Sequence, residues 1–90
     1  MHASSELAAV VRLPESVALH ARPAGAFVRE AARAAAEIRV EANGRSANAK
    51  SILDVLALGA TGGTELVISA SGPDAAEALE RLAELVSGLT

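Results

Sequence analysis

The residues best suited to chemistry lie together at residues 19–24, which read LHARPA. His20 precedes a run that begins like a helix. A helix start leaves backbone amides without acceptors and carries the positive end of the helix dipole, so it suits an anion. Pro23 is compatible with a first helical turn, and Arg22 adds a cation that can bind phosphate oxygens through two N–H groups. An imidazole beside such a site could accept a phosphoryl group and pass it on.

Composition restricts the other kinds of site. Ninety residues, of which 51% are hydrophobic, predict a single domain spanning residues 1–90, with a mobile start at residues 1–6. The chain has no cysteine and only two histidines, so we expect no disulfide, no metal site and no cofactor. His2 is interpreted as a surface residue of the mobile start. A net charge of −3 and a single aromatic residue argue against a nucleic-acid partner.

The chain also lacks membrane and export signals. No apolar run reaches the length of a membrane-spanning helix, and residues 1–6 are too polar for a signal peptide. We therefore expect a cytoplasmic protein without membrane contact, and we also expect it to be a monomer.

Hydrophobic periodicity predicts the elements that position His20. Alternating patterns indicate strands at residues 7–13, 37–42, 45–49 and 65–70, and a helical period indicates helices beginning near residues 21, 52 and 75. Asn43 and Gly44 are typical of a tight hairpin turn, since both accept positive φ. The polarity of residues 45–49 favours a sheet edge. The resulting order, βαββαβα, is that of an α+β fold with helices covering one face of a mostly antiparallel sheet.

The long helices each show an apolar stripe expected to face the core. In the first helix the stripe is Ala24, Phe27, Val28, Ala31 and Ala35, and in the last it is Ala75, Ala78, Leu79, Leu82, Leu85 and Val86. Arg22, Arg29 and Arg33 share the opposite side of the first helix. For Arg29 and Arg33, a solvated face and a surface that docks acidic partners are equally consistent with this pattern. Asp74 and Glu77 suit the dipole at the start of the last helix.

The short middle helix has the expected signals at both ends. Ser51 suits its N-cap, with Asp54 three residues later as in a capping box, and Gly59 suits its end. Leu53 and Ala57 point away from the residues expected to face the core, which are Ile52, Val55 and Leu56. Leu53 and Ala57 are consistent either with core packing in an apolar helix or with an apolar docking patch.

These segments resemble the HPr family, the histidine-containing phosphocarriers of the bacterial sugar phosphotransferase system. Residues 19–24 match the active-site signature of that family, and residues 48–53 with Gly59 match its second signature. Residues 63–65 and the acidic, alanine-rich last helix match as well. The resemblance covers residues 7–89 and implies an open-faced β-sandwich, with a four-stranded antiparallel sheet and three helices on one face.

The resemblance also implies a function. His20 would be phosphorylated on Nδ1 by phosphorylated Enzyme I and would pass the group to IIA domains of sugar permeases, so the protein would be a carrier and not a self-sufficient catalyst. Arg22 would steady the phosphate, and Leu53 with Ala57 would belong to a docking patch near His20. Ser51 would be the counterpart of a regulatory serine that a kinase and a phosphatase modify. The carboxylate of Asp54 would repel a phosphate on Ser51.

Two alternatives remain open at the level of the sequence. One is a regulatory module that keeps the fold but signals through Ser51 or by docking alone. The other is a carrier of a parallel phosphotransfer branch, related to nitrogen regulation or to dihydroxyacetone phosphorylation, because such a branch would use the same site chemistry.

Overall fold

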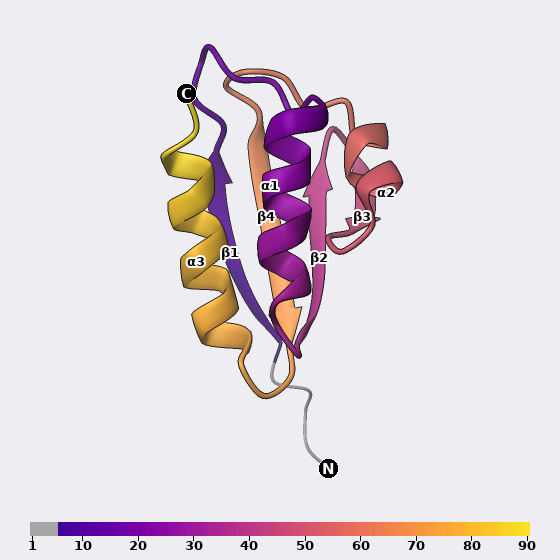
Figure 1. Cartoon of the computed structure of the whole chain (residues 1–90), viewed down its shortest axis with the longest axis vertical. Coiled ribbons are helices and arrows are strands. Elements are labelled where there is room, and N and C mark those ends of the chain that lie inside the picture. Colours follow the sequence, from indigo (N-terminus) through magenta and orange to yellow (C-terminus); the bar gives the residue numbers. More distant parts are fainter. Residues whose placement is uncertain (1–5) are drawn as a thin grey trace.

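The computed structural model describes residues 6–90 and contains one four-stranded sheet with three helices on one face (Figure 1). The predicted order βαββαβα is confirmed, with the elements β1 (Leu7–Arg12), α1 (Ala21–Ala32), β2 (Glu37–Ala42), β3 (Arg45–Asn48), α2 (Ile52–Ala57), β4 (Glu65–Ser71) and α3 (Ala75–Ser87). His2 and the expected mobile start, apart from Glu6, lie outside the described residues. No helix within residues 6–90 is both long and apolar enough to cross a membrane.

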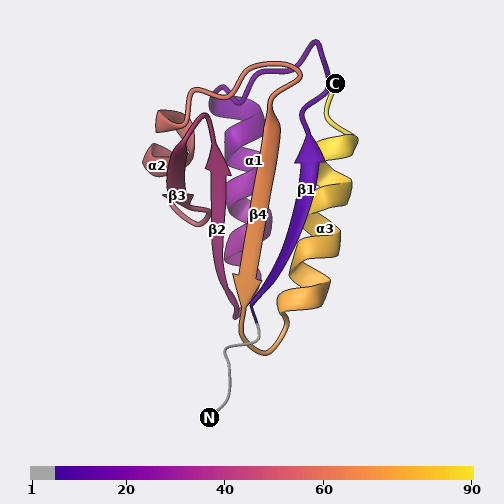
Figure 2. The same ribbon diagram turned by 180° about the vertical axis from the view of Figure 1, so that it is seen from behind.

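The sheet is antiparallel throughout, in the order β1-β4-β2-β3. All three helices lie on one face of the sheet. The opposite face is not covered by any of them, as the view from behind shows (Figure 2). The polar strand β3 is at an edge, as predicted. Asn43 and Gly44 between β2 and β3 have φ of 55° and 75°, the conformation expected of a tight hairpin turn. The protein is therefore an open-faced β-sandwich.

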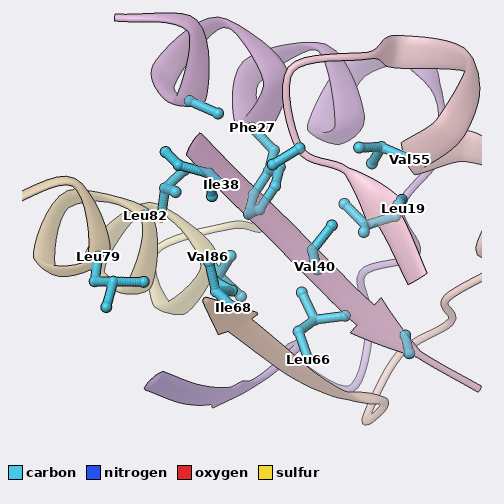
Figure 3. Packing of buried hydrophobic residues seen from close by; sticks show 14 of the residues in the cluster. Leu19, Phe27, Ile38, Val40, Val55, Leu66, Ile68, Leu79, Leu82 and Val86 are labelled. Carbon is cyan, nitrogen blue, oxygen red and sulfur yellow. The ribbon is translucent and has the colours of Figure 1, made fainter. Parts of the chain in front are cut away.

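The core lies between the helices and the covered face of the sheet. Alternate residues of β2 and β4 point into it, so the predicted period of two is confirmed. Phe27 is fully buried and points from α1 onto the sheet (Figure 3). Burial of such side chains is the main force that holds α1 in place.

Two residues predicted to lie in the core are exposed. Ala35 was expected to continue the stripe of α1, but the helix ends at Ala32, and the extended connection buries Ala34 and Ala36 instead. Ile52 is 39% exposed because it is the first residue of a helix only six residues long. Such a short helix covers the sheet with one narrow stripe.

The predicted capping box at α2 is only half formed. Ser51 Oγ accepts from the amide of Asp54 at 3.3 Å, as expected of an N-cap. The Asp54 carboxylate, however, accepts from the Asn48 amide at 3.3 Å, because the Ser51 amide already donates to the Asn48 carbonyl at 3.0 Å. Asp54 therefore ties α2 to the end of β3. Gly59, with φ of 65°, follows the last helical turn as predicted.

Asp74, the N-cap residue of α3, has a role that its position in the sequence does not reveal. Its side chain makes no capping bond to its own helix. Its carboxylate oxygens accept instead from the amides of Ala35, at 3.0 Å, and Ala36, at 2.8 Å. These bonds lower the pKa of Asp74 below its ordinary value. The carboxylate thus joins the connection between α1 and β2 to the start of α3.

Candidate functional site

His20 lies at the surface, directly after a segment of the chain that is largely buried. Val17 and Leu19 are buried, and the Leu19 amide donates to the Ala60 carbonyl at 2.9 Å. His20 itself is exposed and has the extended backbone of an N-cap residue, with φ of −82° and ψ of −170°. The buried neighbour fixes the backbone on one side of His20, and α1 fixes it on the other.

The amino-terminal end of α1 is left open for an anion. The His20 side chain makes no capping hydrogen bond, although its carbonyl accepts from the Ala24 amide at 2.8 Å. Pro23 has no N–H group. The amides of Ala21 and Arg22 therefore have no acceptor within the helix and point out of its positive end. This is the arrangement that binds phosphate at helix starts.

Arg22 is the charged side chain closest in sequence to His20. It is exposed, and within the described part of the chain its guanidinium makes no hydrogen bond or ion pair. The first turn of α1 carries no acidic residue that would compete for it. The five N–H donors of Arg22 are thus free to bind an oxyanion held beside His20.

The other predicted residues of α1 lie farther along the helix. Arg29 is exposed in its last turn, seven residues or about 10 Å of helix axis beyond Arg22. Arg33, the C-cap residue, forms an ion pair with Glu30 at 3.5 Å. Within residues 6–90 neither forms a hydrogen bond or an ion pair with His20.

Helix α2 lies beside the amino-terminal end of α1 (Figures 1 and 2). Leu53 is 76% exposed and Ala57 is also exposed, whereas Val55 is buried. Ser51 is partly exposed, with its hydroxyl engaged as the cap. The polar contacts at the carboxyl-terminal end of α2 carry no local signal in the sequence, because they come from the β2–β3 hairpin.

The site as a whole is a surface imidazole at an uncapped helix start with a free guanidinium two residues away. It can accept a phosphoryl group on a ring nitrogen and bind its oxygens without enclosing them. Together with the open-faced sandwich, these features define the class of small proteins that carry a phosphoryl group on histidine.

Comparisons with known proteins identify the family. The model of the PTS HPr component phosphorylation site matches residues 8–88. The phosphocarrier protein HPr of Vibrio cholerae is 49% identical over 71 residues, which cover 79% of this chain and 84% of that protein. The crystal structure of HPr from Bacillus anthracis superposes with a TM-score of 0.86 at 40% identity, covering 91% of this chain and 98% of that one.

A third match is to Crh of Bacillus subtilis, whose crystal structure is a dimer with a swapped domain. It superposes with a TM-score of 0.71 at 43% identity, and 86% of each chain is covered. The chain therefore belongs to the HPr family, and its function is that of a phosphocarrier protein of the sugar phosphotransferase system. Neither a regulatory module nor a carrier of a parallel branch is favoured by these matches.

Proposed function

We propose that His20 is the residue that carries the phosphoryl group from Enzyme I to IIA domains of sugar permeases. The observation that supports this most directly is the exposed imidazole at the open start of α1, beside the unpaired amides of Ala21 and Arg22. In loading, a lone pair of the ring nitrogen forms the N–P bond as the bond from phosphorus to the donor group of Enzyme I breaks. In unloading, a nucleophile of the IIA domain forms a bond to phosphorus, and the N–P bond breaks with its electron pair left on the ring nitrogen.

Arg22 acts on the phosphate oxygens in this proposal. One guanidinium and two amides orient the group but leave much of it in water, so the phosphoryl group is not held too firmly to be passed on. Because His20 lies on the surface, the partner proteins must exclude water and supply much of the transition-state stabilisation. The protein is therefore a carrier that depends on its partners, and not a self-sufficient enzyme.

Partner docking is assigned to the surface beside His20. The high exposure of Leu53 supports the docking interpretation over core packing, with Ala57 extending the apolar surface. Arg29, exposed on α1, would attract acidic groups of Enzyme I and IIA. A carrier that meets these proteins in turn is expected in the cytoplasm. A single domain can take part in each transfer complex as one copy, so the protein is proposed to be a monomer. Sedimentation of the free protein tests the oligomeric state.

Ser51 is proposed as a secondary, regulatory position for a serine kinase and phosphatase. Its main role in the folded protein is that of helix cap. Phosphorylation would remove that cap and add about two negative charges next to the carboxylate of Asp54. Such a change would alter the docking surface without touching His20.

The decisive experiment is incubation of the protein with Enzyme I and phosphoenolpyruvate. We expect a mass gain of one phosphoryl group, on His20, that is labile in acid and stable in base. His20→Ala should not gain it, and transfer from the labelled protein to a IIA domain should restore the original mass. Phosphorylation of His20→Ala at the normal rate would rule the proposal out.

A further inference from the structure

We propose that the β2–β3 hairpin positions the transfer site, with Asn43 and Arg45 holding α2 and, through the turn after it, the backbone next to His20. The hairpin lies in the sheet next to α2, and neither of these two residues has been given a part in the site so far. The inference rests on the proposed role of His20 and adds two positioning residues to it.

Packing holds α2 at few points. Of its six residues only Val55 is buried, while Leu56 packs partly against the core, and Leu58 is buried directly after the helix. A surface hollow lies between α2 and β3 and is lined by Arg45, Ser46, Asp54, Ala57 and Leu58. An element with so little buried apolar surface depends on polar contacts at its ends for a fixed orientation.

The carboxyl-terminal end of α2 receives these contacts from the hairpin. Arg45 Nη1 donates to the Ala57 carbonyl at 3.1 Å, and Asn43 Nδ2 donates to the carbonyls of Leu58 at 3.1 Å and Gly59 at 3.4 Å. Such carbonyls have no amide partner within a helix. The last turn of α2 contains no basic residue, so Arg45 also supplies the cation that suits the negative end of the dipole.

The hairpin is a suitable anchor because its own geometry is fixed. Asn43 has φ of 55°, a conformation that asparagine tolerates, and Gly44 completes the tight turn with φ of 75°. Both flanking strands are paired in the sheet. The amide of Asn43 is thus presented to α2 from the rigid part of the molecule.

The same turn leads directly to His20. Ala60 follows Gly59, and its carbonyl accepts the Leu19 amide at 2.9 Å. Ala60 and Leu19 are both buried, 3% and 4% exposed. His20 is the next residue after Leu19. Displacement of the turn at 57–60 would therefore move the docking helix and the residue before His20 relative to each other.

The expected consequence is a loss of fit to partners, with the chemistry of the imidazole left intact. Enzyme I must contact the docking surface on α2 and reach His20 in the same complex. If α2 and His20 no longer keep a fixed relative position, the complex with Enzyme I forms less readily. Once formed, the complex transfers the phosphoryl group at nearly the normal rate.

The test uses Asn43→Gly, Arg45→Met and the double variant in the full chain. Glycine accepts the positive φ and removes the amide side chain, although it also makes the turn more flexible. We expect the KM of Enzyme I for the double variant to rise about threefold to tenfold and kcat to change less than about twofold. The Leu19 amide should exchange with solvent faster than in the original protein. Arg45→Lys, which keeps a donor, should have a KM close to that of the original protein.

Arg39→Met is the matched control. Arg39 lies in the same hairpin, but its guanidinium donates to Ser46 Oγ, at 3.2 and 3.1 Å, and not to α2. It should leave KM and Leu19 exchange unchanged in assays run well below the unfolding midpoint of every variant. A double variant with the original KM and Leu19 exchange, or an equal change in Arg39→Met, would overturn the inference. Retained phosphorylation of His20→Ala would instead refute the proposed function, so the two failures are distinguishable.

Discussion

The starts of α1 and α2 differ in what they offer to the first backbone amides, which have no acceptor within a helix. Both helices begin after a residue with extended backbone, His20 in one and Ser51 in the other. Ser51 caps its helix through Oγ, and Asp54 adds a negative charge in the first turn. The start of α1 has neither a side-chain cap nor an acidic residue, which leaves its amides available.

The lengths and burial of the two helices explain why both arrangements are stable. Helix α1 has twelve residues and buries Ala24, Phe27 and Ala31, so packing holds it without a cap. Helix α2 has six residues and one buried side chain. The comparison teaches that an anion site is left open where the core already holds the helix, and that capping groups are used where it does not.

The largest effect is expected from His20→Asp, which turns the open start into a capped one. Aspartate is a favourable N-cap residue, and the backbone at position 20 already has the required geometry. The free energy of unfolding should rise by about 1 kcal/mol, while phosphoryl transfer is lost completely because no imidazole remains. Urea denaturation and the Enzyme I assay measure the two effects.

His20→Ala is the control for this variant, since it removes the imidazole without adding a cap. It should also lose transfer, but without the gain in stability. Equal stability of the aspartate and alanine variants would mean that the start of α1 is not open in solution, and the contrast with α2 would not hold.

Arg22→Met should produce the next largest effect. Removal of the guanidinium takes away the charged donors closest in sequence to His20, so the rate of transfer should fall by about tenfold while stability hardly changes. Arg81→Met, an equivalent change on the exposed surface of α3, serves as the control and should leave the rate unaltered. Equal rates in the two variants would remove Arg22 from the site.

Ser51→Ala should show the opposite pattern to Arg22→Met. Loss of the cap on an exposed, 3.3 Å hydrogen bond should lower the free energy of unfolding by about 0.5 to 1 kcal/mol. The rate of phosphoryl transfer should change little, since His20 and Arg22 are untouched. If Ser51→Ala instead lost transfer at full stability, α2 would take a direct part in the chemistry.

Local signals in the sequence were sufficient for most of the fold. The alternation in β2, the turn at Asn43 and Gly44, and the cap at Ser51 each depend on neighbouring residues, and each is confirmed. The position of His20 at a helix start is also a local property. Its exposure and the absence of a capping bond follow from the chain path and required the structure.

Contacts between distant segments could not be predicted in the same way. The carboxylate of Asp54 could have accepted from the amide of Ser51 or from that of Asn48, both close to it in sequence. In the folded chain it accepts from the Asn48 amide. Asn43 was identified only as a turn residue, although its side chain also caps α2. Ala35 was misplaced because a helical period persists in the sequence beyond the point where α1 ends.

The smallest effect concerns a third helix start, that of α3, and appears as a dependence on pH. The amides of Ala35 and Ala36 lower the pKa of Asp74 below its ordinary value of 3.8. A carboxyl group with a lowered pKa contributes stability that is fully present above its unfolded pKa and is lost as the pH falls through its folded pKa. Stability should therefore decrease below about pH 4.

In Asp74→Asn this part of the decrease should be absent, and the variant should be less stable than the original protein near pH 7. Urea midpoints measured from pH 7 down to acid, with Glu77→Gln on the exposed first turn of α3 as control, test this. Parallel curves for the original protein and Asp74→Asn would show that the Asp74 carboxylate does not hold the connection between α1 and β2.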